Sequence, residues 1–293
     1  MNDSSPTQLI RLSTAAAASM LLWISRTLLG LLVSYPILLA IRASSMASGP
    51  EGDAVLFQPG SLLLLELLRL GAPWLASATR LALFLAGLSA ILELIPLAMA
   101  LDMLWLPGRP LLERVARALR LFPRFLALGA IALLAQAALL LAASLLTLAL
   151  KPALSSADER LQNLAPIALF GLGLLACTWF GCVLDIARAT LVRRGLHDSQ
   201  DVHERGARSA LAHALLCLRE RPFSVLIGAY PSVAGSALGY LSAAWLLTRL
   251  DLAGPSSVPI ALAFGAHQLA VLFAIAWRVR WLGTALELSR GDN

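Results

Sequence analysis

Charged residues are scarce in this chain. They make up 14% of its 293 residues, whereas hydrophobic residues make up 59%. A soluble domain of similar length carries about 25% charged residues. Together with a mean hydropathy of +0.78, this scarcity excludes a soluble globular protein and leaves no room for a separate soluble domain beside an integral membrane domain spanning residues 1–293.

Cysteine is scarce as well. The chain has three cysteines, Cys177, Cys182 and Cys217. No two of them fall in a segment that we expect to be exported, so no disulfide framework is predicted. A metal site would need further soft ligands near them, and the sequence offers none. We expect three small packing residues, with no metal and no cofactor.

Catalytic motifs are also missing. The apolar stretch 164–187 contains no serine, which excludes an intramembrane serine protease because that mechanism needs a serine nucleophile there. The sequence has no glutamates paired with histidines of the kind that a membrane metalloprotease needs. It has no phosphate-binding loop of an ATPase. We therefore expect a protein that is not an enzyme.

Long apolar stretches dominate what is present. Each is long enough to cross a hydrocarbon core of about 30 Å as a helix of about 20 residues. Because Asp3 and the length of the first stretch do not suit a cleavable signal, we expect that stretch to remain a membrane helix. The pattern predicts an all-α, polytopic membrane helix bundle with six transmembrane helices, at residues 20–41, 80–105, 125–150, 164–187, 223–248 and 258–281.

The basic residues are distributed unevenly between the two sides of these spans. With the N-terminus inside, 17 of the 23 basic residues lie inside and 6 outside. Basic loop residues resist export, so the bias predicts an N-in/C-in topology in the inner (plasma) membrane of a bacterium. The pI near 10.0 then indicates attraction to anionic lipids of the inner leaflet. No basic-aromatic patch suggests nucleic acid, which we exclude as a partner.

Two expected cytoplasmic segments have similar patterns. Residues 111–121 and 206–218 place arginines at helical spacing among leucines and alanines, and each precedes a proline, Pro123 or Pro222. We predict that each segment is an amphipathic interfacial helix, ended by the proline before a membrane helix begins. Residues 7–19 form a weaker third copy. A short apolar run at 61–70 is expected near the outer interface.

The acidic ends of the spans suggest internal repeats. Asp102, Asp185 and Glu287 each follow an apolar pair at the end of a descending helix. Asp185 has an arginine three residues later, Arg188, with which it can pair on a helix. We interpret the chain as three two-span repeats with boundaries near 1–105, 109–188 and 205–290.

Of the residues in the predicted spans, Glu93 costs the most free energy to place inside a membrane. It lies near the middle of the second span and precedes Pro96. A charge at this depth costs at least about 2.5 kcal/mol, so it should face protein or water. Arg26 is the expected partner by depth, for Glu93 or for Asp102. His267 is a second candidate partner for Glu93, and such a pair could titrate near neutral pH. Structural roles for both residues remain open.

The fifth predicted span carries a face of small residues. Gly235 and Gly239 are four residues apart, and so are Ser232 and Ser236. Small residues on one face allow two helices to approach closely. We expect a packing face here, with a substrate groove as the alternative.

One resemblance rests on Arg120-Leu121-Phe122-Pro123-Arg124-Phe125, on Arg221-Pro222-Phe223, and on the closing stretch from Gln268 to Arg280 with its terminal Ala285-Leu286-Glu287-Leu288. In layout, the chain resembles uncharacterised bacterial six-span membrane proteins that are similar to the membrane domain attached to some glycerophosphodiester phosphodiesterases. The catalytic phosphodiesterase domain is absent, so the resemblance implies a membrane domain and no active-site residue.

Three functions remain open. The first is a non-enzymatic inner-membrane protein, permease-like or a scaffold, with other membrane subunits or further copies of itself as partners. The second is a secondary transporter or channel subunit that uses the intramembrane polar residues Arg26, Glu93, Asp102 and His267. The third is an integral-membrane enzyme, which the missing motifs disfavour. Asp185 completes the set of intramembrane polar candidates.

Overall fold

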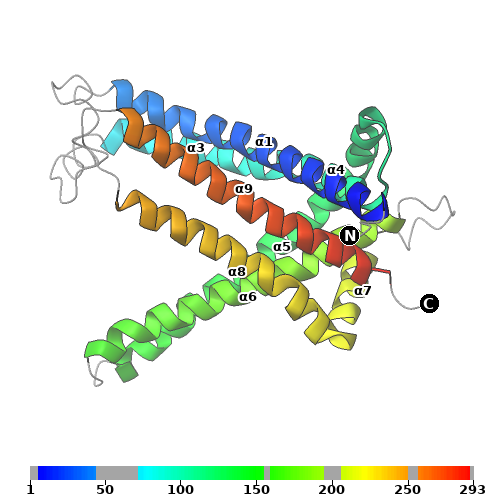
Figure 1. Ribbon diagram of the computed structural model, residues 1–293. Helices are drawn as coiled ribbons and strands as arrows, with labels where there is room; N and C mark the ends of the chain where they lie inside the picture. Colours follow the sequence, from blue (N-terminus) through cyan, green and yellow to red (C-terminus); the bar gives the residue numbers. More distant parts are fainter. Residues whose placement is uncertain (1–5, 44–71, 155–158, 195–205, 250–256, 291–293) are drawn as a thin grey trace. The chain divides into compact units, whose positions relative to one another are not determined.

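The computed structural model describes residues 6–43, 72–154, 159–194, 206–249 and 257–290, in which every regular element is a helix (Figure 1). Six helical segments are long and apolar enough to cross a membrane: Leu12–Leu39, Ala76–Trp105, Leu111–Leu150, Leu164–Arg194, Pro222–Leu246 and Ala261–Leu288. This confirms the all-α class and the six predicted spans. The predicted outer run at 61–70 lies outside the described residues.

The helices are α1 (Pro6–Ala43), α3 (Ala72–Leu92), α4 (Leu94–Trp105), α5 (Leu111–Leu154), α6 (Glu159–Arg194), α7 (Ala207–Glu220), α8 (Pro222–Leu247) and α9 (Ser257–Leu288). They form two compact units, one of Met1–Gly108 with Tyr230–Arg280 and one of Arg109–Ala229 with Trp281–Asn293. The division at Gly108 coincides with the predicted boundary between the first two repeats. The third predicted repeat is divided between the units.

In the first unit, α1 packs against α3 and α4 (Figure 1). Its core is a cluster of Ala18, Leu22, Ala100, Ile275 and Val279, contributed by α1, α4 and α9. Two of these five side chains are alanines, which allow the helix backbones to approach closely.

In the second unit, α5 and α6 pack side by side, and α7 packs against both (Figure 1). Buried side chains include Phe125 on α5 and Ile186 on α6. The buried residues of α7 are Ala210, Ala214 and Cys217, at the three- and four-residue spacing of one helix face. The amphipathic pattern of this segment therefore directs its small residues toward the unit.

The two predicted helix boundaries at prolines have different outcomes. The break at Pro222 is confirmed: Arg221 leaves helical geometry at φ −133° and ψ 55°, and α8 starts at the proline, where no N–H is needed. The break at Pro123 is wrong, because α5 continues through it. A proline removes one backbone hydrogen bond, and packing along α6 keeps this long helix continuous. Residues 7–19 likewise continue into α1 without a break.

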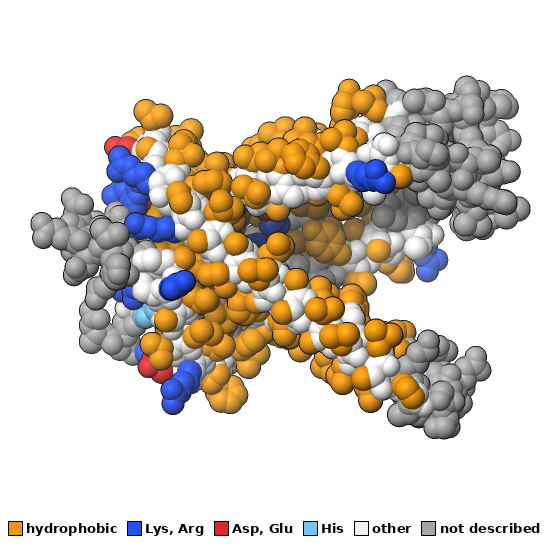
Figure 2. All heavy atoms as spheres, turned by 180° about the vertical axis from the view of Figure 1, so that it is seen from behind, with side chains coloured by type: hydrophobic (Ala, Val, Ile, Leu, Met, Phe, Trp, Pro, Cys, Tyr) orange, Lys and Arg blue, Asp and Glu red, His pale blue; other side chains and the backbone are white. Residues whose placement is uncertain are grey.

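The helices present large apolar surfaces. Many large side chains are exposed along the spans, among them Leu133 and Leu134 at 71% and Leu175 at 68%. Figure 2 shows apolar side chains covering much of the helical surface. Contiguous exposed apolar surface of this extent is typical of a membrane-embedded protein.

Glycines of α8 are covered by bulky side chains of α9. In the first unit, a Cβ added at Gly235 would meet the Trp277 ring at 2.5 Å, and one at Gly239 would meet Phe273 at 3.1 Å. In the second unit, a Cβ at Gly228 would meet Thr284 at 2.9 Å. The small residues of α8 thus form the predicted packing face.

Candidate functional site

Glu93 lies at the junction between α3 and α4. Pro96, three residues later, has no N–H to donate to the Leu92 carbonyl, and its ring crowds that carbonyl. On either side the helical ladder persists, since Glu93 N donates to Ser89 O at 2.8 Å and Leu97 N donates to Glu93 O at 3.1 Å. The proline therefore explains why the helix is interrupted beside the acid.

Glu93 forms an ion pair with Arg26 of α1, whose Nε donates to the Oε1 atom of the glutamate. Both residues lie well inside apolar spans, Leu12–Leu39 and Ala76–Trp105. A lone charge at this depth costs at least about 2.5 kcal/mol, and pairing offsets part of that cost. The expected pairing of Glu93 with Arg26 is confirmed.

A second polar contact lies beside the ion pair. The Thr27 hydroxyl donates to Gln268 Oε1 at 3.3 Å and links α1 to α9. Arg26, Thr27, Glu93 and Gln268 together form what we call the polar layer. It joins three helices of the first unit inside their apolar spans.

His267 is not part of the polar layer. Its side chain is exposed, and it makes no hydrogen bond or ion pair within the described part of the chain. Successive helical residues point about 100° apart, so the inward position of Gln268 turns His267 away. The predicted Glu93–His267 pair is therefore wrong.

In the first unit, Ser89 Oγ and Trp23 Nε1 are buried without a partner among the described residues. Other helical hydroxyls bond a carbonyl of the preceding turn, as Ser19 does with Ala15 O and Ser236 with Ser232 O. The Ser89 side chain is 8% exposed and does not take this local option. A buried polar group without a partner costs about 1–3 kcal/mol unless water satisfies it.

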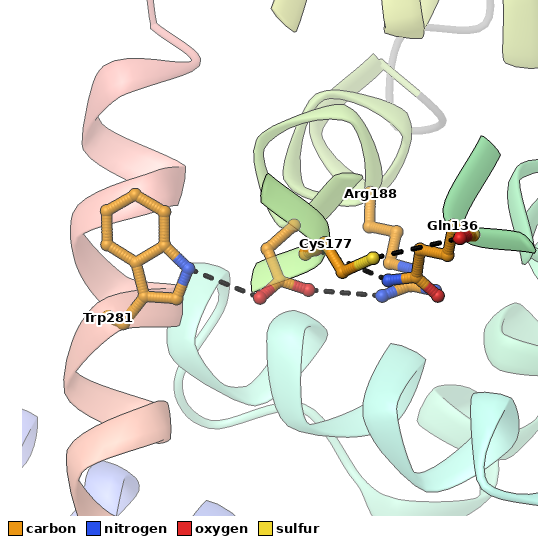
Figure 3. Close-up of polar contacts among 5 residues, drawn as sticks. Gln136, Cys177, Arg188 and Trp281 are labelled. Carbon is orange, nitrogen blue, oxygen red and sulfur yellow. Dashed lines mark hydrogen bonds and ion pairs between the residues drawn. The ribbon is translucent and has the colours of Figure 1, made fainter. Parts of the chain in front are cut away.

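The second unit contains a buried carboxylate at the end of α6. Asp185 is 5% exposed. Its Oδ1 accepts from Arg188 Nη1 at 3.1 Å, and its Oδ2 accepts from Trp281 Nε1 at 3.2 Å (Figure 3). The predicted Asp185–Arg188 pair is confirmed. Sequence reasoning missed Trp281, since its position 96 residues away carries no local signal.

Asp102 occupies the corresponding end of α4 in the first unit and is 2% exposed. Glu287, the third acid of the predicted repeat, is exposed. The three acids therefore differ in burial, and the repeats stay a prediction.

Gln136 and Cys177 connect α5 to α6 within their spans. Gln136 Nε2 donates to the Cys177 carbonyl at 3.4 Å, and Cys177 Sγ approaches the Gln136 carbonyl at 3.8 Å (Figure 3). Each side chain contacts the other residue's backbone. The contacts satisfy an amide inside the membrane and explain Cys177 as a packing residue.

The carbonyls at the end of α9 are held by side chains of α6 and α7. Ser289 O accepts from Arg193 Nη1 and lies 3.4 Å from His213 Nε2, and Cys217 Sγ lies 3.8 Å from Leu288 O. The last carbonyls of a helix have no intrahelical donors. Basic side chains here also suit the negative end of the helix dipole.

His213 and Cys217 lie one turn apart on α7, with Sγ 3.6 Å from Nε2. Burial lowers the pKa of His213, and the neighbouring Arg194 lowers it further. Burial raises the pKa of the Cys217 thiol, and Glu220 adds to the effect. Both groups are therefore neutral near neutral pH, which is the opposite of an activated thiolate–imidazolium pair.

Comparison with known proteins identifies no relative. No protein-family model matches the chain, and no curated protein or solved structure matches it. Among the residues that the structure describes, no three His, Cys, Asp or Glu side chains are grouped so as to hold a metal ion. The function must therefore be inferred from the polar groups themselves.

Proposed function

We propose that the chain is a permease-like protein of a bacterial inner membrane, with both termini inside, and that the polar layer is its working charge site. The supporting observation is the Arg26–Glu93 pair beside a proline interruption inside two apolar spans. Ionisable groups inside membranes usually mark pathways for ions or substrates. Interrupted helices recur where transporters bind their ligands.

The exposure of the pair supports transport. The side chains of Arg26 and Glu93 are 30% and 31% exposed in the chain. Acyl chains cannot solvate this remaining surface, so water or a polar solute must reach it. A permease provides such access, whereas a scaffold would cover the pair with another subunit or a second copy of the chain.

The scaffold remains the second candidate, on a different observation. The outward face of α7 exposes Arg208, Leu215, Leu216 and Arg219. Leucines beside arginines suit the inner interface, where anionic lipids lie. Under this alternative the inner face carries the function and the polar layer is structural. The resemblance to phosphodiesterase-linked membrane domains is compatible with either role.

A charge-displacement measurement tests the proposal. Proteoliposomes adsorbed to a capacitive electrode receive a rapid pH jump, and proton binding at Glu93 gives a transient current. Glu93→Gln removes the carboxylate and should abolish that current. Glu287→Gln, which alters an exposed acid, should retain it. A wild-type protein with no Glu93-dependent current would favour the scaffold.

A further inference from the structure

The contacts of α1 with α3 and α4 define an antiparallel register in the first unit. Arg26 pairs with Glu93, and Ala18 and Leu22 share a core cluster with Ala100. Residue numbers therefore rise along α1 as they fall along α3 and α4. Trp23 is level with Pro96 in this register.

Helices α1, α3 and α4 also carry buried polar residues. Those of the described first unit are Ser19, Ser89 and Asp102, at 8%, 8% and 2% exposure. They lie on α1, α3 and α4, above and below the ion pair. We call the set Ser19, Trp23, Arg26, Ser89, Glu93 and Asp102 the polar seam.

Two pairs within the seam recur at helical spacing. Ser89 precedes Glu93 by four residues, and Ser19 precedes Trp23 by four, so each pair shares a helix face. Glu93 and Asp102 are nine residues apart, which is about 14 Å along a helix and about half a turn around it, so they lie on different faces of the helix. That distance is too long for direct proton transfer, so any exchange between the two acids needs water between them.

Two atoms of the seam favour water. Ser89 Oγ and Trp23 Nε1 are buried without a protein partner among the described residues, and they lie on opposite sides of the ion pair in the register. Buried polar groups of this kind are commonly satisfied by ordered water. Pro96 adds a Leu92 carbonyl that lacks its usual intrahelical donor.

We propose that the polar seam is a hydrated proton path, in which Glu93 binds the proton and Asp102 exchanges it with the inner side. The inference rests on the proposed function and names its coupled ion. In the binding step a hydronium ion transfers H⁺ to a carboxylate oxygen of Glu93, an O–H bond forms and water leaves. Arg26 keeps its charge while its partner becomes neutral, and release reverses the step.

The described part of the first unit contains other charged or titratable groups. Arg80 lies on α3, Asp102 on α4, and His267, Arg278 and Arg280 on α9. In the described part of the unit, Arg26 is the charged group that contacts the Glu93 carboxylate. Protonation of Glu93 therefore changes the charge balance of the ion pair first.

Cysteine accessibility tests the hydration. In a background with Cys177, Cys182 and Cys217 replaced by alanine, Ser89→Cys is compared with Ala90→Cys, its exposed neighbour on another face of α3. A small water-soluble thiosulfonate reacts with thiolates, which need water to form. We expect mixed-disulfide formation, with release of sulfinate, to be at least about tenfold faster at position 89 than at position 90. Equal rates would overturn the hydrated seam.

Charge displacement tests the route. In the pH-jump assay, Asp102→Asn should slow the Glu93-dependent current at least about tenfold without reducing its total charge, because the relay loses its entry group. Asp102→Glu keeps a protonatable group and should restore the rate. Asp185→Asn, which alters the buried acid of the other unit, is the matched control and should match wild type.

The outcomes separate this inference from the proposed function. A Glu93-dependent current whose rate is unaffected by Asp102→Asn overturns the route through Asp102 and leaves the permease proposal standing. Absence of any Glu93-dependent current overturns the permease proposal and the proton path with it. Each variant is assayed at a temperature well below its own unfolding midpoint, where it is folded and monodisperse, so that a changed rate does not reflect misfolding.

Discussion

Trp281 donates its indole N–H to Asp185 across 96 residues of sequence, at 3.2 Å. The carboxylate is 5% exposed and the indole 3%. Arg188 binds the other carboxylate oxygen at 3.1 Å, so both oxygens of a buried acid are satisfied. The contact fixes the end of α9 against α6 in the second unit.

Removal of the indole donor should therefore destabilise the protein. Trp281→Phe keeps an aromatic ring and removes the N–H, and a hydrogen bond to a charged group contributes about 1.5–3 kcal/mol. Reversible unfolding in mild detergent measures the loss. Trp245→Phe, at a side chain that is 61% exposed, is the control. Equal stability of the two variants would show that the Asp185 contact contributes little.

The α8–α9 contact predicts a sharp size limit at Gly235. An alanine Cβ there would lie 2.5 Å from Trp277 Cδ1 and 2.7 Å from its Cγ, close to the base of the side chain, where it cannot swing away. Gly235→Ala should cost about 1–3 kcal/mol through overpacking.

Gly87 is the matched control in the same unit, since a Cβ there meets nothing within 4 Å. Gly87→Ala should be neutral or gain about 0.5–1 kcal/mol from reduced backbone entropy of the unfolded chain. Thermal unfolding of both variants measures the difference. Equal effects at the two positions would contradict the close approach of α8 to α9.

The lowered pKa of His213 predicts that the stability of the protein depends on pH. Its pKa lies below the ordinary 6.5 because of burial and Arg194, so the folded protein binds this proton less readily than the unfolded chain. The contribution of neutral His213 to the free energy of unfolding should be fully present above pH 6.5. It should fall as the pH drops toward the lowered pKa of the folded state. His213→Gln keeps a donor for Ser289 O and should remove this component. Unfolding curves from neutral to mildly acidic pH test it, and an unchanged pH slope in the variant would contradict it.

Local patterns predicted the elements and two of the polar pairs. Long apolar runs are strong signals, and all six spans followed from them. The similar depths of Arg26 and Glu93 in their predicted spans suggested this ion pair, because few polar side chains lie near the middle of two spans. Helical spacing suggested Arg188 for Asp185, which needs no tertiary information.

The remaining features depend on packing that a single sequence does not encode locally. Pro123 and Pro222 follow similar patterns, yet one lies inside α5 and the other starts α8. Neighbouring helices decide whether the lost hydrogen bond is tolerated. His267 and Gln268 are adjacent on α9 and point about 100° apart, and the sequence alone did not indicate which of them contacts α1.

The orientation of the spans is open to direct labelling. In a cysteine-free background of intact cells, Asp53→Cys, Ser156→Cys and Gly254→Cys should react with a membrane-impermeant reagent. Leu112→Cys and Gln200→Cys should react only after permeabilisation. The expectation follows from the 17 basic residues placed inside against 6 outside. The reverse labelling pattern would invert the topology and the direction of the proposed proton path.

The central claim is that Arg26 and Glu93 are coupled inside the membrane, and a double-mutant cycle tests it most directly. Either Arg26→Leu or Glu93→Leu leaves one charge unpaired and should cost about 1–3 kcal/mol in unfolding free energy, less than in a fully buried pair because the two side chains are 30% and 31% exposed. The double variant removes both charges and should lie much closer to wild type than the summed losses. The account predicts this large coupling energy, and additive losses from the two single variants would contradict it.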